Sequence, residues 1–170
     1  MASGFQTQLI AKSHAVKDFR CEHSSLADYL RRYARQTTSR GGARTFILPA
    51  ADDPTIVLGY YTLTPAEMDA DKLPPDLVKG LGRYPYPGFR LARLAVDERY
   101  AGKGVGRTLL IDAGLRCLAA ADQVGGSAMF IDAKDEKAAA FYRKFGAQAL
   151  ADWPLLLVLP LATFAAARQA

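Results

Sequence analysis

The sequence has few of the residues that build metal centres and disulfide frameworks. Among 170 residues there are two cysteines and two histidines. Cys21 and Cys117 lie far apart and form no CxxC spacing, so we expect neither a zinc site nor a disulfide scaffold. These absences favour a reducing, cytoplasmic location and predict that no metal takes part in the chemistry.

Long apolar runs and internal repeats are also absent. No stretch of about 18 apolar residues occurs, and residues 1–12 lack the apolar core of a secretion signal. We therefore expect no membrane span and no membrane partner. Half of the residues are hydrophobic and 23% are charged, which is typical of an ordinary folded chain. The length predicts a single domain over residues 1–170.

Positive charge is concentrated in the first quarter of the chain. Residues 1–44 carry eight Lys and Arg residues against three acidic ones, whereas residues 45–170 carry fourteen of each sign. A local positive excess attracts polyanions, so nucleic acid or the phosphates of a cofactor are candidate partners. The alternative is a solvated basic surface without a specific partner.

The hydrophobic pattern predicts alternating strands and helices. Strands are expected near residues 5–10 and over 45–48, 55–64, 89–96, 127–131 and 155–161. Helices are expected over residues 24–35, 104–121 and 135–145. Residues 37–44 and the proline-rich residues 65–88 are expected to be irregular. This order predicts a mixed α/β (α+β) fold in which helices flank a central sheet.

A glycine-rich segment follows the strand expected at 89–96 and opens the next helix. Gly102, Gly104 and Gly106 let the backbone approach a ligand, and the first helical N–H groups are unsatisfied where the helix dipole favours negative charge. Lys103 and Arg107 add positive charge. The spacing fits neither the dinucleotide fingerprint nor the P-loop, so these residues alone leave a phosphate site and a simple tight turn equally open.

Three segments in order resemble the acetyl-CoA core of the GNAT superfamily of N-acetyltransferases: Leu91–Asp97, Ala101–Leu110 and Ala140–Gly146. The resemblance implies the GNAT fold, with a mixed sheet of six to seven strands and acetyl-CoA bound at the splay between the fourth and fifth strands. In that family, the fourth strand pairs with the pantetheine arm and the following loop holds the pyrophosphate. The cofactor-binding residues that it implies are Leu94, Ala95, Val96, Lys103, Gly104, Val105, Gly106, Arg107 and Asp135.

Tyr142 is the candidate catalytic residue, because the family motif places it in the Phe-Tyr pair of the last long helix. A phenol with a pKa near 10 is protonated at neutral pH and can protonate the departing thiolate. A purely packing role is the alternative. No general base stands out, although Glu67, Asp97 or Glu136 could act through water. An α-amine with a pKa near 8 needs no base, so the missing base favours an α-amine acceptor.

A closer resemblance covers nearly the whole chain. His14–Cys21, Arg44–Phe46, Gly59–Leu63 and Leu91–Asp97 resemble segments of the acetyltransferase toxins of bacterial type II toxin–antitoxin pairs. The resemblance implies acetylation of the α-amine of aminoacyl-tRNA, inhibition of translation, a homodimer and a ribbon-helix-helix antitoxin. The candidate RNA-binding residues are Arg31, Arg32, Arg35, Arg40, Arg44 and Arg93.

Some roles and functions stay open at this point. Arg93 either faces the substrate or packs against an acid. The same fold acting on a protein N-terminus or a small amine is one alternative function, although a cationic acceptor would prefer an acidic funnel. A non-catalytic RNA- or partner-binding module is another. The chain also departs from common family residues: it has Ala101 in place of Gln or Arg, Asp135 in place of Asn, and Ala147 in place of an aromatic residue.

Overall fold

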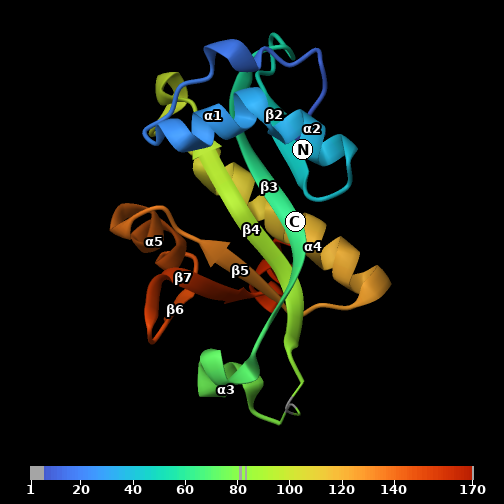
Figure 1. The fold of residues 1–170 in the computed structure, drawn as a ribbon, viewed down its shortest axis with the longest axis vertical. Helices are drawn as coiled ribbons and strands as arrows, with labels where there is room; N and C mark the ends of the chain where they lie inside the picture. The colour runs from blue at the N-terminus through green and yellow to red at the C-terminus, as the bar shows by residue number, and fades with distance from the viewer. Residues whose placement is uncertain (1–5, 81, 83, 170) are drawn as a thin grey trace. The chain divides into compact units, whose positions relative to one another are not determined.

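A computed structural model of the chain describes residues 6–80, 82 and 84–169. Seven strands form one sheet in the order β1-β2-β3-β4-β5-β7-β6 (Figure 1). The β4–β5 pair is parallel, whereas β1–β2, β2–β3, β5–β7 and β6–β7 are antiparallel. This mixed sheet with its helices confirms the predicted fold class. The chain divides into two compact units, Met1–Thr64 with Ala92–Ala113, and Pro65–Leu91 with Gly114–Ala170.

The first unit contains the N-terminal strands and the helices that follow them. Its elements are β1 (Gln8–Leu9), η1 (Val16–Asp18), α1 (Ser24–Arg32), α2 (Ala34–Ser39), β2 (Arg44–Pro49) and η3 (Glu98–Tyr100). Three longer elements run through both units: β3 (Val57–Met68), β4 (Tyr86–Val96) and α4 (Val105–Val124).

Within the first unit, alternate residues of β3 face different helices. Tyr60 belongs to the core that α1 forms with the sheet, and its hydroxyl donates to the Leu26 carbonyl at 2.6 Å. Its neighbours Gly59 and Tyr61 instead face α4, since Tyr61 donates to Asp112 and a Cβ on Gly59 would lie 2.8 Å from a Leu109 methyl group. Because strand side chains alternate between faces, α1 and the start of α4 cover opposite faces of this part of the sheet.

The helix predicted over residues 24–35 continues further than expected. The N–H of Tyr33 donates to the Tyr29 carbonyl and that of Thr37 to the Tyr33 carbonyl, both at 2.9 Å, so helical bonding carries over from α1 into α2. The chain leaves the helix just before Gly41, whose φ of 77° is the left-handed conformation common after a helix. The expectation that residues 37–44 form a loop is therefore wrong for residues 37–39.

The second unit contains the C-terminal strands. Its own elements are η2 (Ala70–Lys72), α3 (Pro75–Val78), β5 (Ala128–Asp132), α5 (Glu136–Arg143), β6 (Gln148–Leu150), β7 (Trp153–Pro160), η4 (Leu161–Phe164) and α6 (Ala165–Arg168). Phe130, Leu150 and Val158 form its core together with Leu73. Burying apolar side chains of this size contributes about 1.5–3 kcal/mol each.

Several predicted boundaries need correction. Residues 65–88 are less irregular than expected, because β3 reaches Met68, β4 begins at Tyr86 and α3 lies between them. The short strand β6 was not expected at all. The strand near residues 5–10 is reduced to Gln8–Leu9, and residue 5 lies outside the described residues. No helix among the described residues has the length and apolar character needed to cross a bilayer.

Candidate active site

The glycine-rich segment forms an open helix N-terminus. Gly102 and Gly104 have φ values of 74° and 81°, and a Cβ on either would meet no atom within 4 Å. The first helical bond of α4 runs from the Thr108 N–H to the Gly104 carbonyl at 3.1 Å. The N–H groups of residues 105–107 therefore have no acceptor within the helix. A helix end of this kind can bind an anion, which stays a prediction for this turn.

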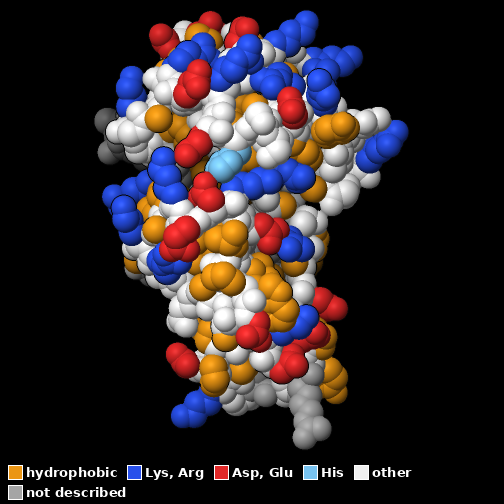
Figure 2. Space-filling model, turned by 60° about the vertical axis from the view of Figure 1, so that its left-hand side comes forward, with side chains coloured by type: hydrophobic (Ala, Val, Ile, Leu, Met, Phe, Trp, Pro, Cys, Tyr) orange, Lys and Arg blue, Asp and Glu red, His pale blue; other side chains and the backbone are white. Residues whose placement is uncertain are grey.

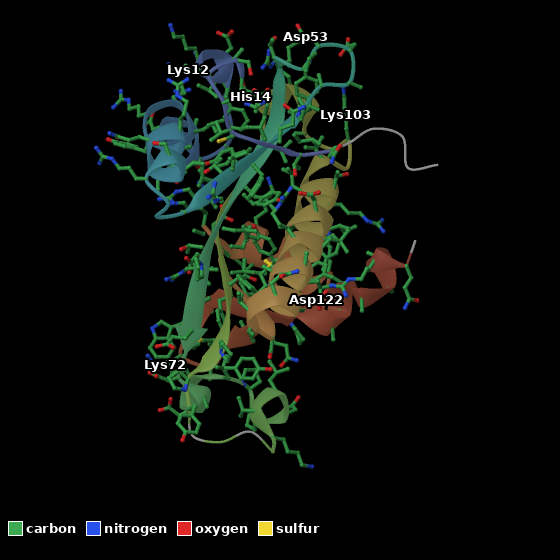
Figure 3. The ribbon with its side chains drawn as sticks, turned by 90° about the vertical axis from the view of Figure 1, so that its right-hand side faces the viewer. Lys12, His14, Asp53, Lys72, Lys103 and Asp122 are labelled. Carbon is green, nitrogen blue, oxygen red and sulfur yellow. The ribbon has the colours of Figure 1, made fainter. Side chains whose placement is uncertain are left out.

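Two exposed cations flank this helix end. Lys103 lies two residues before the start of α4 (Figure 3) and Arg107 lies in its first turn, and both side chains are exposed. Positive side chains beside unsatisfied N–H groups complement the charge of a diphosphate. The sequence prediction placed Lys103, Gly104, Val105, Gly106 and Arg107 together, and the first unit contains all five at this turn.

A missing side chain lets α4 approach the sheet. A Cβ at Gly59 would lie 2.8 Å from the Ala95 carbonyl oxygen and 2.8 Å from Leu109 Cδ1, closer than real Cβ contacts. Glycine on β3 therefore sets how closely the first turns of α4 pack against the strands. This packing fixes the position of the glycine turn.

The buried carboxylate of Asp97 holds the segment between β4 and the glycine turn. Asp97 is fully buried and accepts hydrogen bonds from the Arg99 N–H at 2.9 Å, the Arg99 Nε at 2.8 Å and the Arg20 N–H at 3.2 Å. Burial would raise the pKa of this carboxyl, but the hydrogen bonds from Arg99 and Arg20 outweigh it and lower the pKa. Asp97 is thus an ionised structural anchor, and its lone pairs are committed.

The main chain of β4 has a free stretch next to this turn. Its pairing with β5 runs from Gly88 to Leu91, opposite Ala128 to Ile131, whereas β4 itself continues to Val96. Residues 92–96 therefore have no β5 partner on that edge. The predicted residues Leu94, Ala95 and Val96 lie in this stretch, and the main-chain groups among them that face this edge can bind an extended ligand.

Tyr142 lies on α5 in the second unit and is 5% exposed. Burial raises the pKa of its phenol, and the charge of Asp132 raises it further. The hydroxyl therefore keeps its proton throughout the neutral range, which is the state that a proton donor requires. Phe141 packs edge-on against the Tyr142 ring with 5.2 Å between centroids, which restricts the ring.

Asp135 has a structural task that the sequence interpretation did not identify. Its carboxylate accepts from the Ala138 N–H at 2.8 Å and forms the N-cap of α5. Aspartate and asparagine are both strong N-cap residues, so the departure from the common asparagine preserves the cap. The two candidate bases besides Asp97 have different surroundings. Glu136 pairs with Arg143, and Glu67 lines a groove of about 360 Å³ in the second unit.

The basic residues of the first unit fall into two groups. Figure 2 shows Lys and Arg side chains dense over this unit, with acidic side chains among them. Arg31 is already engaged, because its guanidinium donates to the Phe19 carbonyl at 2.7 Å and to Asp28 at 2.9 Å. Arg32 and Arg35, by contrast, are exposed and make no ion pair with any described residue. Sequence reasoning grouped all three arginines, and only the structure separates them.

A groove of about 460 Å³ runs beside α1 and α2 and combines these cations with an apolar floor. Lys12, Arg32 and Arg35 line it together with the apolar Ile10 and Val16. Lys12, on the segment between β1 and η1 (Figure 3), was not among the predicted site residues. Lys12 is one of the basic residues of the first quarter, so the sequence showed its charge. That residues 10–16 pack beside α1 and α2 is a tertiary feature that the sequence did not show.

Arg93 packs on an aromatic ring. Its guanidinium carbon lies 3.7 Å from the centroid of Tyr29, and no described residue forms an ion pair with it. The alternative that it packs against an acid is therefore wrong within the described residues. Arg40 and Arg44 are exposed on either side of the turn after α2.

Sequence reasoning also missed a polar cluster on α4. Asp112 accepts from the Thr7 hydroxyl at 2.6 Å and from the Tyr61 hydroxyl. The only sequence signal was Asp112 itself, a charged residue in a largely apolar helix. His14, 4% exposed, accepts the Ala11 N–H through Nδ1 at 3.0 Å and contacts Gln8 Oε1 through Nε2 at 3.1 Å. The Asp112 cluster ties Thr7 to α4, whereas the His14 contacts lie within the N-terminal segment.

Comparison with known proteins agrees with this geometry. The acetyltransferase (GNAT) domain family matches residues 44–146. The chain is 36% identical over 150 residues to a tRNA-acetylating toxin of Mycobacterium tuberculosis, with 88% of each chain covered. It is 27% identical over 158 residues to a probable toxin, TacT, of Sinorhizobium fredii, with 88% of this chain and 87% of the relative covered.

Solved structures give the same result. A tyrosine-to-phenylalanine mutant of KacT superimposes with a TM-score of 0.87 at 26% identity, covering 95% of this chain and 98% of the other. AtaT in complex with acetyl-methionyl-tRNAfMet superimposes with a TM-score of 0.87 at 25% identity, covering 96% and 98%.

Proposed function

We propose, since the chain belongs to the GNAT family of acetyltransferases, that this enzyme transfers the acetyl group of acetyl-CoA to the α-amine of an aminoacyl-tRNA and thereby inhibits translation. One observation carries the proposal: the open N-terminus of α4 presents N–H groups and two cations to an anion. The similarity to a tRNA-acetylating toxin of Mycobacterium tuberculosis and to AtaT in complex with acetyl-methionyl-tRNAfMet supports the choice of acceptor.

The donor half of the site is built from the fourth strand and the turn after it. Acetyl-CoA supplies the acetyl group as a thioester. The N–H groups of residues 105–107, with Lys103 and Arg107, are assigned to the diphosphate. The edge of β4 along Leu94, Ala95 and Val96, beyond its pairing with β5, is assigned to the pantetheine arm. Asp135 caps α5, and we assign it this supporting role in place of a direct contact with the coenzyme.

Tyr142 is assigned as the proton donor to the departing thiolate. Its raised pKa keeps the phenol protonated at neutral pH, and its burial limits competition from water. No described carboxylate takes the role of base in this scheme. The α-amine of an aminoacyl ester has a pKa near 8, so a substantial fraction is neutral and reactive without one.

The acceptor half uses the basic surface of the first unit. The unpaired cations Lys12, Arg32 and Arg35 line one groove, and Arg40 and Arg44 extend the positive surface past α2. Phosphate contacts by Lys and Arg supply most of the sequence-independent affinity for RNA. Arg31 supports this surface indirectly, because it fixes the Phe19 carbonyl rather than a ligand.

The proposal extends to assembly and regulation. We propose a single catalytic domain that forms a homodimer and is silenced by a ribbon-helix-helix antitoxin. The structure of a tyrosine-to-phenylalanine mutant of AtaT bound to the C-terminus of the antitoxin AtaR supports an antitoxin partner for this chain. Light scattering on the purified protein tests the dimer, and growth arrest that the neighbouring gene relieves tests the antitoxin.

The direct test follows labelled acetyl groups. The enzyme is incubated with radiolabelled acetyl-CoA and total charged tRNA, and label on the tRNA is measured before and after mild alkaline hydrolysis of the ester. The proposal requires label that leaves the tRNA as an N-acetyl amino acid. Uncharged tRNA is the control. Label on an N-terminal peptide or a polyamine, with none on charged tRNA, would replace this function with the alternative acceptor.

Charge reversal separates the two groups of arginines. Arg32→Glu with Arg35→Glu is expected to weaken tRNA binding about a hundredfold or more at low salt and to reduce the salt dependence of binding. Lys17→Glu, at an exposed position on η1 outside the lining of the groove, is the control for a single charge reversal and should change binding by far less than half as much. Filter binding between 50 and 200 mM salt measures both. Normal binding by the double variant would remove the groove from the RNA site.

A further inference from the structure

Arg93 differs from the neighbouring arginines Arg90 and Arg99 in having no acidic partner among the described residues. Arg90, three residues earlier on the same strand, is paired with Asp132 through two hydrogen bonds of 2.6 and 2.9 Å. Arg99 is paired with the buried Asp97. Arg93 is half-buried and has no such acid among the described residues. A partly desolvated guanidinium without a counter-charge is costly, unless a ligand supplies that charge.

An aromatic column holds this guanidinium in place. The Phe19 ring meets Tyr60 edge-on at 5.7 Å, Tyr60 stacks with Tyr29 at 6.4 Å, and the Arg93 guanidinium lies over the Tyr29 ring at 3.7 Å from its centroid. The Tyr60 hydroxyl fixes the column to the Leu26 carbonyl. Stacking uses the flat face of a guanidinium and leaves its N–H edge available, and that edge matches a phosphate or carboxylate.

The face of the sheet indicates which anion is involved. Arg93 contacts Tyr29 of α1, so it lies on the face that α1 covers, whereas the glycine turn opens α4 on the opposite face. The coenzyme diphosphate is assigned to the α4 side. The anion on the α1 side therefore belongs to another group, and this side also carries Arg32 and Arg35.

We infer that Tyr29 holds Arg93 as a fixed recognition group for a backbone phosphate of the RNA acceptor. Arg93 is then a specificity-determining residue that favours an RNA-linked amine over a free one, and Tyr29 is a positioning residue that acts through it. This inference rests on the proposed function for the identity of the RNA, but its binding test does not require catalysis.

The first measurement is the binding of uncharged tRNA as a function of salt. Arg93→Ala is expected to weaken binding about tenfold or more at low salt and to reduce the slope of log K against log salt by about one, as for the loss of one phosphate contact. Arg168→Ala, which removes an arginine paired with Asp122 on α4, is the charge-matched control and should leave the slope unchanged. An unchanged slope for Arg93→Ala overturns the inference.

Variants at Tyr29 distinguish positioning from structural support. Tyr29→Phe keeps the ring face and should bind tRNA like the wild type. Tyr29→Leu removes the ring face and should lose part of the affinity that Arg93→Ala loses. If both Tyr29 variants match the wild type, the positioning role is wrong. If Tyr29→Leu unfolds, Arg93→Lys provides a second test, since a lysine keeps the charge without the planar fork and should recover the salt slope but not the full affinity.

Steady-state kinetics with two acceptors distinguish RNA recognition by Arg93 from a structural role. With aminoacyl-tRNA, Arg93→Ala should raise KM by about tenfold or more with little change in kcat; with an amino acid ethyl ester, both constants should stay near wild type. Equal losses on the two acceptors would show a structural role and overturn the inference. If the wild-type enzyme binds tRNA but acetylates none, the proposed function fails, while the salt slope still decides the role of Arg93. A wild type that binds no tRNA overturns both.

Discussion

Replacing Gly104 with alanine tests the donor site most directly. Gly104 has a φ of 81°, and its Cβ would point into open space with no protein atom within 4 Å. The left-handed backbone costs an alanine about 1–2 kcal/mol, which for a chain of this length lowers Tm by roughly 2–8 °C. The added methyl group also enters the space assigned to the diphosphate. Losing one charged hydrogen bond there costs about 1.5–3 kcal/mol, which lowers acetyl-CoA affinity by about ten- to a hundredfold.

The other end of the same helix provides the control. Gly125 follows α4 with a φ of 88°, and its Cβ would also meet no atom within 4 Å. Gly125→Ala should therefore lose a similar amount of stability but bind acetyl-CoA like the wild type. Scanning calorimetry measures the first effect and titration calorimetry the second. If Gly104→Ala binds acetyl-CoA as tightly as Gly125→Ala does, the amides at the start of α4 do not hold the coenzyme.

Three further predictions address the proton donor, pH and packing. Tyr142→Phe should lower kcat by about a hundredfold or more and leave acetyl-CoA affinity nearly unchanged; an unchanged kcat refutes the proton-donor role. Burial lowers the pKa of His14 below its usual value near 6.5. The unfolded chain therefore takes up a proton first, so urea midpoints should fall as pH decreases through about 6.5, and less so in His14→Gln. Gly59→Ala should destabilise the protein by about 1–3 kcal/mol, as measured by urea unfolding, because its Cβ overlaps the Ala95 carbonyl.

Much of the fold could be predicted from local signals. The long apolar helix was expected at 104–121 and forms over Val105–Val124, because a glycine turn and a continuous apolar surface are both local features. The strands at 89–96 and 127–131 were found within three residues of their true starts for the same reason. The short strand β6 was not predictable, since its three residues are held in place by pairing with β7. The proline-rich residues 65–88 were wrongly predicted to be irregular throughout, because β3 and β4 continue into them through pairing that the sequence does not show.

The candidate site was predictable where the chemistry lies in consecutive residues. Gly102 to Arg107 needed only a loop and a helix start, and the structure has both. Residues that act through distant partners were not predictable. The sequence could not show that Arg31 is tied to Phe19, or that Asp135 caps α5. Tertiary packing decides which charges remain available.

Unpaired cations carry more information about this enzyme than its net charge. The chain has an excess of five positive charges, but several of its arginines already neutralise an acid, as Arg90 and Arg99 do. Ion pairs of this kind contribute little to attraction of an external polyanion, because each pair is nearly neutral at a distance beyond the Debye length. Removing Arg90 should therefore change the salt slope of tRNA binding less than removing Arg93, although both lie on β4 and carry the same charge. A binding slope that follows net charge alone, with equal effects at the two positions, would contradict the assignment of the RNA surface to the unpaired residues.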